Sequence, residues 1–158
     1  MIKNNNKNID IVKVNSSKID RVDFDNLSFG SIFTDHMLVC DFKNGVWEKP
    51  VIKPYEPFLI DPSAKVFHYG QAIFEGMKAY KDAQDDVWLF RADENFKRFN
   101  KSAERLAMPQ ISEEIFVDGL KTIIDLERDW VKKGMGNSLY IRPFMIATGS
   151  GVMAQPSS

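Results

Sequence analysis

Tyr140 and Arg142 are the pair of residues whose types and spacing point most directly to chemistry. They lie two positions apart in a β-prone run, and in a strand that spacing puts both side chains on one face. A hydroxyl and a guanidinium that face the same way form a receptor for a carboxylate. The alternative interpretation is a half-buried edge strand, in which packing against a neighbouring strand explains both side chains.

Arg98 is a candidate for binding a phosphate, because its planar guanidinium offers two parallel donors. It lies in a predicted helix, beside an apolar stripe whose members recur at steps of three and four: Phe96, Phe99, Ala103 and Leu106. An arginine on a solvated helix face has the same spacing. The spacing alone therefore favours that structural interpretation.

The segment at residues 68–80 is too specific in order and composition to be ordinary core sequence. Tyr69 and Phe74 are suited to the walls of an apolar pocket, and Gly76 allows a close approach of the backbone. Judged by pattern alone, such residues lie more often in a core than in a pocket. Core packing is therefore the alternative interpretation of this segment.

Short strands must position these residues. They are predicted at 9–14, 34–42, 77–81, 87–91 and 139–148. Asn44-Gly45 is a strong hairpin signal, because both residues tolerate positive φ, and Val46 would begin the return strand. Pro143 requires an edge or a bulge in the last of these strands.

Two helices are predicted between the strand pair at 77–91 and the last strand. Asp93 is the predicted N-cap of the first, which ends at Pro109. Ser112 is the predicted N-cap of the second, which closes at Gly134. The second helix would bury an apolar stripe: Ile115, Phe116, Leu120, Ile123, Ile124 and Trp130. Strands, two helices and another strand predict an α+β domain, an open α/β arrangement of two layers.

Composition excludes several classes of protein. The 158 residues, 44% hydrophobic and 27% charged, fit one soluble globular domain. A net charge of -1 gives no electrostatic case for nucleic acid, and no apolar run approaches the ~20 residues of a membrane span. Cys40 has no disulfide partner, which favours a reducing cytoplasm, and we interpret it as a small buried hydrophobe. His36 and His68 lack the spacing of a metal site, and we interpret His36 as structural.

Three blocks add a family resemblance to this interpretation of the residues: 29–37, 68–80 and 138–143. In that order they resemble branched-chain amino acid aminotransferases, pyridoxal-phosphate enzymes of the class IV aminotransferase fold. The resemblance covers residues 24–152. It implies an N-terminal portion only, with the small α+β domain of the class IV, D-amino acid aminotransferase-like, fold.

The resemblance also implies a division of the chain. Residues 1–18 would form a polar tail with a possible short first strand, and residues 19–148 would form the small domain. Residues 149–158 would be an interdomain loop leading to a larger domain that lies beyond this chain. In the family, the Schiff-base lysine and the glutamate that pairs with the pyridine nitrogen both belong to that larger domain, so the resemblance gives no catalytic residue here.

Binding roles follow from the resemblance residue by residue. It implies that Arg98 binds the cofactor phosphate. The residues that it implies for the substrate pocket are Phe29, Tyr69, Phe74, Gly76, Tyr140, Arg142 and Val152. The Tyr140–Arg142 pair would receive the side-chain carboxylate of glutamate, and Val152 would begin a loop that reaches the partner's pocket in the family homodimer.

The function implied is transfer of the amino group of leucine, isoleucine or valine to 2-oxoglutarate through pyridoxal 5'-phosphate. Glutamate and branched 2-oxo acids would be the products. We expect the 158-residue chain by itself to be inactive and to hold no cofactor covalently. The alternatives are another class IV enzyme, such as a D-amino acid aminotransferase or an aminodeoxychorismate lyase, or a non-catalytic folded or dimerising module. The blocks at 29–37 and 68–80 favour the branched-chain type.

Overall fold

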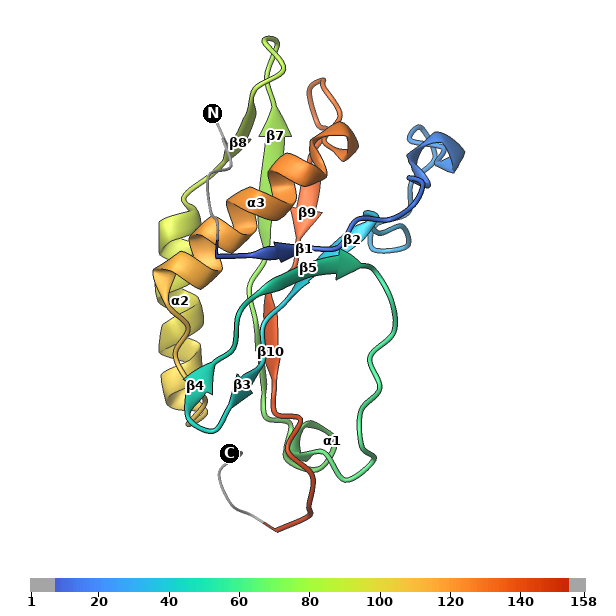
Figure 1. Ribbon diagram of the computed structural model, residues 1–158. Helices are drawn as coiled ribbons and strands as arrows, with labels where there is room; N and C mark the ends of the chain where they lie inside the picture. The colour runs from blue at the N-terminus through green and yellow to red at the C-terminus, as the bar shows by residue number, and fades with distance from the viewer. Residues whose placement is uncertain (1–7, 154–158) are drawn as a thin grey trace.

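The computed structural model describes residues 8–153, which form a mixed fold of small sheets and three α-helices (Figure 1). The helices are α1 (Lys65–Tyr69), α2 (Ala92–Arg105) and α3 (Gly119–Leu126). The strands are β1 (Asp10–Ile11), β2 (His36–Val39), β3 (Phe42–Lys43), β4 (Val46–Trp47), β5 (Val51–Pro54), β6 (Ala72–Phe74), β7 (Met77–Lys81), β8 (Val87–Leu89), β9 (Leu139–Ile141) and β10 (Phe144–Ile146). None of the helices in this described part has the length and apolar character needed to cross a membrane.

A long, interrupted antiparallel ribbon runs through the centre of the fold. β6 pairs with β10, and β7 pairs with β9 on one side and β8 on the other. Glu75-Gly76 interrupts the ribbon between β6 and β7. Arg142-Pro143 interrupts it at the same level between β9 and β10. The Glu75 amide donates a hydrogen bond to the Pro143 carbonyl across the break (2.9 Å). The predicted strand at 139–148 is therefore two strands, because Pro143 has no amide hydrogen for a continuous ladder.

The core lies between one face of the β8-β7-β9 sheet and the helices α2 and α3 (Figure 1). Alternation along β7 turns Met77 and Ala79 into this core and leaves Lys78 and Tyr80 exposed on the other face. The main members of the core are Ile73, Met77, Ala79, Val87, Phe99, Ala103, Met108, Phe116, Leu120, Ile124 and Val131. This arrangement confirms the predicted two-layer α/β fold, which leaves the second face of the sheet open.

The first predicted helix differs from α2 at both ends, and α2 stops at Arg105 rather than near Pro109. Arg91, in a left-handed conformation (φ 52°), precedes the helix, and Asp93 lies inside its first turn, so the predicted cap at Asp93 is wrong. A carboxylate there still interacts favourably with the helix dipole. The buried stripe is Asn95, Phe99 and Ala103. Leu106 follows the last turn and is exposed, contrary to prediction.

The second predicted helix begins as expected but ends earlier. The Ile115 amide donates to Ser112 Oγ (3.2 Å), which confirms the predicted cap. A π-helical segment at Glu114–Asp118 precedes α3, and the helix stops at Leu126 rather than near Gly134. The chain continues as a 3₁₀ turn at Arg128–Trp130, which buries Trp130 as predicted. Ile115 and Ile123 are half-buried, and the other predicted stripe members are buried.

Local turn signals are confirmed where they are strongest. Asn44 (φ 52°) and Gly45 (φ 81°) close the β3–β4 hairpin with positive φ at both positions. The hairpin of β7 and β8 forms as predicted, although β8 ends at Leu89 rather than at residue 91. The strands predicted at 9–14 and 34–42 are shorter than expected, at β1 and at β2 with β3. The sequence pattern missed α1 altogether.

A buried polar network fastens the N-terminal segment to the body of the fold. His36 Nδ1 donates to Glu127 Oε1, while His36 Nε2 accepts a hydrogen bond from the Val14 amide (2.9 Å). The Asp35 carboxylate accepts from Trp130 Nε1 (3.3 Å) and from the Lys18 amide (3.0 Å). His36 is thus a structural residue of β2, as interpreted from the sequence. The division of the chain at residues 18 and 148 stays a prediction.

Candidate functional site

Gly76 and Tyr140 approach each other closely where the central ribbon breaks. A Cβ added at Gly76 would lie less than 3.0 Å from Tyr140 Oη and 3.2 Å from its Cζ. Only glycine fits this position without displacing the tyrosine ring. The two residues are therefore packed as a unit, although they are far apart in the sequence.

An aromatic and cationic cluster is built on this unit. Tyr140 Oη accepts hydrogen bonds from Arg142 Nε (3.2 Å) and Nη2 (2.7 Å). The Arg142 guanidinium lies 4.4 Å from the centre of the Phe74 ring. Phe29 packs edge-on against Tyr140, with ring centres 5.0 Å apart. Five of the residues singled out in the sequence thus form one group, which we call the Tyr140 cluster: Phe29, Phe74, Gly76, Tyr140 and Arg142.

The Tyr140 cluster combines two kinds of recognition. Phe29 and Phe74 remain largely exposed, at 78% and 63%, so their ring faces are free to pack against an apolar group. Arg142 is also exposed and keeps donors that Tyr140 does not use. Those donors suit a carboxylate. The geometry therefore provides apolar walls with a cationic group at their edge.

Tyr69 and Val152 form a second, separate pair. Tyr69 Oη donates a hydrogen bond to the Val152 carbonyl. Gly70 follows Tyr69 and ends α1 in the left-handed conformation (φ 60°). The Gly151 amide, next to Val152 in the sequence, donates a hydrogen bond to Ser63 Oγ (3.0 Å). Between residues 8 and 153, no hydrogen bond or ring contact joins this pair to the Tyr140 cluster.

Arg98 is held by a carboxylate that the sequence interpretation did not assign. Its Nε and Nη2 donate to Glu75 Oε1 (3.1 Å) and Oε2 (2.9 Å), a bidentate ion pair. Asn95 Nδ2 donates to the same Glu75 Oε2 (2.7 Å) and to the Gly76 carbonyl (3.3 Å). Burial raises the pKa of Glu75, but the hydrogen bonds from Arg98 and Asn95 outweigh it and bring that pKa below its usual value. The side chain is therefore a carboxylate.

Arg98 faces an open hollow of about 300 Å³ on the surface between β7 and α2. The residues that line the hollow are Gly76, Met77, Lys78, Tyr80, Phe90, Arg91, Glu94, Asn95 and Arg98. Gly76 contributes to this hollow and also supports Tyr140. Gly76 therefore connects Arg98, the candidate phosphate-binding residue, with the Tyr140 cluster, the candidate substrate pocket.

Glu75 and Asn95 are the site residues that sequence reasoning missed. Two signals could have indicated them. Glu75 is a lone carboxylate among the apolar and aromatic residues of its segment, and Asn95 is three positions before Arg98, on the same face of a helix. Both residues are buried, with exposures of 9% and 6%.

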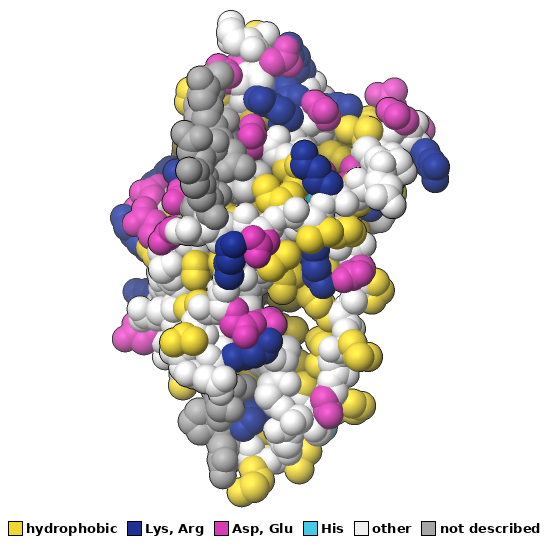
Figure 2. Space-filling view, in the orientation of Figure 1, with side chains coloured by type: hydrophobic (Ala, Val, Ile, Leu, Met, Phe, Trp, Pro, Cys, Tyr) yellow, Lys and Arg dark blue, Asp and Glu magenta, His cyan; other side chains and the backbone are white. Residues whose placement is uncertain are grey.

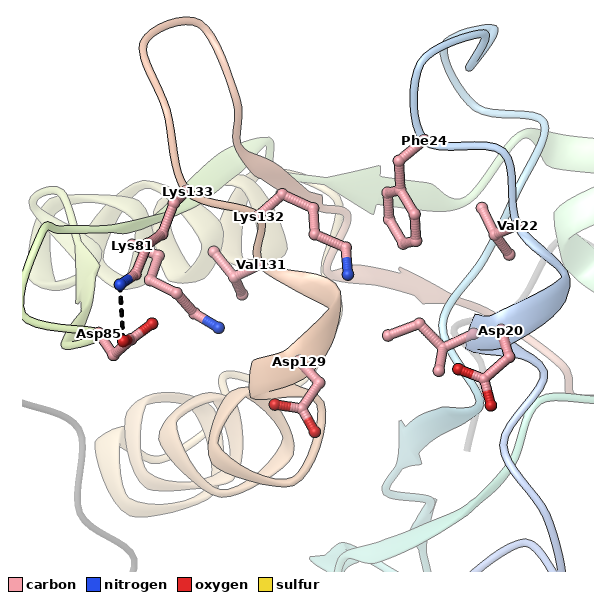
Figure 3. Close-up of a pocket in the computed structure, with 10 residues that line it drawn as sticks. Asp20, Val22, Phe24, Lys81, Asp85, Asp129, Val131, Lys132 and Lys133 are labelled. Atoms are coloured by element: carbon pink, nitrogen blue, oxygen red, sulfur yellow. Dashed lines mark ion pairs between the residues drawn. The ribbon is translucent and has the colours of Figure 1, made fainter.

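A larger hollow of about 570 Å³ contains none of the predicted site residues (Figure 3). Lys133 pairs there with Asp85 (2.6 Å), and the Lys132 ammonium lies 4.1 Å from the centre of the Phe24 ring. Three lysines and three aspartates line it, so their formal charges cancel: Lys81, Lys132, Lys133, Asp20, Asp85 and Asp129. This balance distinguishes no class of ligand.

Other reactive side chains have structural surroundings. Cys40 is half-buried and donates to the Glu48 carbonyl (3.1 Å). Burial, with the nearby carboxylates, raises the pKa of its thiol to about 11, so it is not a nucleophile at neutral pH. His68 Nε2 lies 3.0 Å from the Pro62 carbonyl. Among residues 8–153, no group of three or more His, Cys, Asp or Glu side chains is placed to hold a metal.

Comparison with solved structures defines the class of protein. A branched-chain amino acid aminotransferase from Escherichia coli matches with a TM-score of 0.53 and 23% identity, over 78% of this chain and 36% of that one. A second branched-chain amino acid aminotransferase, solved in complex with N-(5'-phosphopyridoxyl)-L-glutamate, matches with a TM-score of 0.51 and 28% identity, over 76% and 36%. The holo-form of the enzyme from Thermobaculum terrenum matches with a TM-score of 0.50 and 23% identity, over 68% and 34%. The chain therefore has the fold of the N-terminal part of a class IV aminotransferase.

Sequence relatives narrow the class to one family. The chain is 52% identical over 130 residues to branched-chain-amino-acid transaminase 1 of Bacillus subtilis (strain 168). It is 53% identical over 140 residues to a probable branched-chain-amino-acid aminotransferase of Staphylococcus epidermidis (strain ATCC 12228 / FDA PCI 1200). These matches cover 82% and 88% of the chain but only 36% and 38% of the relatives. No family model matches. The chain corresponds to the N-terminal portion of a branched-chain aminotransferase, which confirms the resemblance of the three sequence blocks.

Replacing Gly76 with alanine tests the close approach on which the cluster is built. The added methyl would overlap the Tyr140 hydroxyl, and the tyrosine ring would have to move away. Because Gly76 is exposed and Tyr140 is only half-buried, we expect the free energy of unfolding to fall by about 1 kcal/mol, the low end of the cost of overpacking. Urea denaturation measures the loss. Because Tyr140 Oη is the nearest atom, Gly76→Ala should cost less in a Tyr140→Phe background than in the wild type. An equal cost in both backgrounds would show that the two residues do not meet.

Proposed function

We propose that this chain is the binding and selecting part of an aminotransferase that moves the amino group of leucine, isoleucine or valine to 2-oxoglutarate. The observation that carries the proposal is the Tyr140 cluster, set beside Arg98 in a chain about half identical to proteins named for this activity. The chain spans little more than a third of those relatives, so the activity belongs to a longer parent enzyme.

The side chains around Arg98 fit pyridoxal 5'-phosphate. Glu75 occupies Nε and one hydrogen of Nη2, and the remaining guanidinium hydrogens are available to a phosphate beside the hollow. Arg98 would hold the phosphate of the cofactor through this free edge. When bound, the cofactor supplies the electron sink for chemistry at the amino acid α-carbon.

One pocket would serve two unlike substrates through the Tyr140 cluster. Leucine, isoleucine and valine present apolar side chains, which would pack on Phe29 and Phe74. Glutamate and 2-oxoglutarate present a carboxylate, which would accept hydrogen bonds from Arg142 and from the Tyr140 hydroxyl. Tyr69 and Val152 would extend the wall of the pocket from the α1 side.

We also propose that the parent enzyme is a cytoplasmic homodimer. Large apolar side chains lie exposed along the loop that follows β5, where Figure 2 shows a row of hydrophobic groups: Tyr55, Phe58 and Leu59. Exposed apolar residues that gather on one edge support an interface there, which either the rest of the parent chain or a second subunit would cover.

A transamination assay tests the proposed function. The parent enzyme, supplied with pyridoxal 5'-phosphate and 2-oxoglutarate, should convert leucine, isoleucine and valine and form glutamate. We expect the 158-residue chain alone to show no turnover under the same conditions, because none of its lysines lies in the family's lysine motif. Turnover by this chain alone would overturn the second expectation. A parent enzyme that acts on D-alanine and not on leucine would overturn the first.

A further inference from the structure

We propose that Glu75, steadied by Asn95, is a positioning residue that aims the Arg98 guanidinium at a phosphate. The inference rests on the proposed function, since it needs Arg98 to be the phosphate-binding group. It goes beyond that function by assigning a role to a buried carboxylate that does not line the hollow, and to a buried amide whose nitrogen is already bound to Glu75 and to the Gly76 carbonyl.

The two edges of the Arg98 guanidinium have opposite environments. Nε and Nη2 are bound by both oxygens of Glu75, at 3.1 and 2.9 Å. The Arg98 side chain is nevertheless 59% exposed, whereas the Glu75 side chain is 10% exposed. A long side chain that is clamped on one edge and free on the other loses less conformational freedom when a ligand binds. The clamp therefore orients the free edge before the ligand arrives.

Glu75 is itself fixed from two directions. Its amide donates a hydrogen bond to the Pro143 carbonyl, in the break between β9 and β10 (2.9 Å), and its carboxylate accepts one from Asn95 of α2 (2.7 Å). Asn95 also bonds the Gly76 carbonyl (3.3 Å). The direction of Arg98 is thus set by the same break in the ribbon that places Gly76 under Tyr140. One backbone feature aligns the phosphate group with the substrate pocket.

The alternative role for Glu75 is charge balance alone, and it predicts the opposite effect on phosphate binding. If the carboxylate only balances the charge of Arg98, its neutralisation would strengthen the attraction between Arg98 and a phosphate. If it positions Arg98, the same change would weaken phosphate binding, because the guanidinium would lose its fixed direction. Glu75→Gln keeps the size of the side chain and removes the charge. The sign of its effect separates the two views.

Glu94→Gln is the matched control. Glu94 lies on α2 with Arg98 and lines the hollow that Arg98 faces, but it pairs with Lys97 (2.8 Å) and makes no hydrogen bond to Arg98. Its replacement removes the same charge near Arg98 without loosening the guanidinium. We expect it to leave cofactor affinity unchanged or to increase it.

The experiment measures dissociation constants of the parent apoenzyme for pyridoxal 5'-phosphate and for pyridoxal, which lacks the phosphate. We expect Glu75→Gln to weaken the first by about 10-fold, the lower end of the effect seen when a residue that orients a metal ligand is replaced, and to leave the second within about two-fold. In an Arg98→Ala background, Glu75→Gln should add nothing. Equal losses for both ligands would mean a merely structural role and would overturn the inference, as would unchanged or tighter binding of the phosphate.

Failure of the inference is distinguishable from failure of the proposed function. If Arg98→Ala leaves the affinity for pyridoxal 5'-phosphate intact, Arg98 does not bind the phosphate and the proposed role of this residue fails. If Arg98→Ala weakens that affinity and Glu75→Gln does not, only the positioning role of Glu75 fails. If Glu75→Gln does not fold, Asn95→Ala keeps the charge and loosens the clamp. A phosphate-selective loss in that variant supports the inference, and no loss overturns it.

Discussion

Replacing His36 with alanine is expected to lower the free energy of unfolding by about 3 kcal/mol, because it leaves a buried carboxylate and a backbone amide without their hydrogen-bond partners. Glu127 is 3% exposed and would lose the hydrogen bond from His36 Nδ1. The Val14 amide would lose its acceptor at the same time. Chemical denaturation of the chain measures the loss. His68→Ala is the control, because that exposed histidine has one contact with a carbonyl and should cost less than about 1 kcal/mol.

The His36→Ala loss should depend on pH in a definite direction. Burial raises the pKa of the Glu127 carboxyl, and the hydrogen bond from His36 opposes that rise. Without His36 the pKa of Glu127 rises further. An acid whose pKa is raised in the folded state destabilises that state only when it ionises, so the loss should be largest at neutral pH and shrink toward the ordinary carboxyl value of 4.5. A loss that is constant over this range would contradict an unpaired Glu127.

The Arg98→Ala change has the largest expected effect on ligand binding. Truncating one member of a hydrogen-bonded charge pair typically costs about 2–5 kcal/mol, which is a loss of about 30-fold or more in affinity. Two effects add here. The phosphate would lose the free edge of the guanidinium, and the buried Glu75 carboxylate would remain without its cation, close to an incoming anion. We expect pyridoxal, which has no phosphate, to lose much less affinity.

Local signals predicted the parts of the fold that depend on neighbours in sequence. The Asn44-Gly45 hairpin needs only two residues with positive φ, and the Ser112 cap needs only one hydroxyl near its own helix. By contrast, α1 has five residues and no side-chain cap, so no periodic pattern could indicate it. The break that splits the predicted strand at 139–148 was visible as Pro143. The change of partner across that break, from β7 beside β9 to β6 beside β10, was not.

The candidate site was predictable by residue type and not by geometry. Gly76 and Tyr140 were both singled out, yet their contact depends on the register of β7 with β9, which pattern does not specify. Glu75 and Arg98 are 23 residues apart, and His36 and Glu127 are 91 apart. Such pairs form only when sheets and helices pack, because nothing local requires either partner. Buried polar pairs, in the site and elsewhere in the fold, are therefore what the sequence pattern did not predict.

Titration of pyridoxal 5'-phosphate onto the parent apoenzyme tests the central claim most directly. The wild type should be compared with Arg98→Ala and with Cys40→Ala, which alters a half-buried side chain that lines neither hollow. We predict a dissociation constant raised by about 30-fold or more for Arg98→Ala and nearly unchanged for Cys40→Ala. Equal dissociation constants for the two variants would contradict the assignment of Arg98 to the cofactor phosphate and the site built around it.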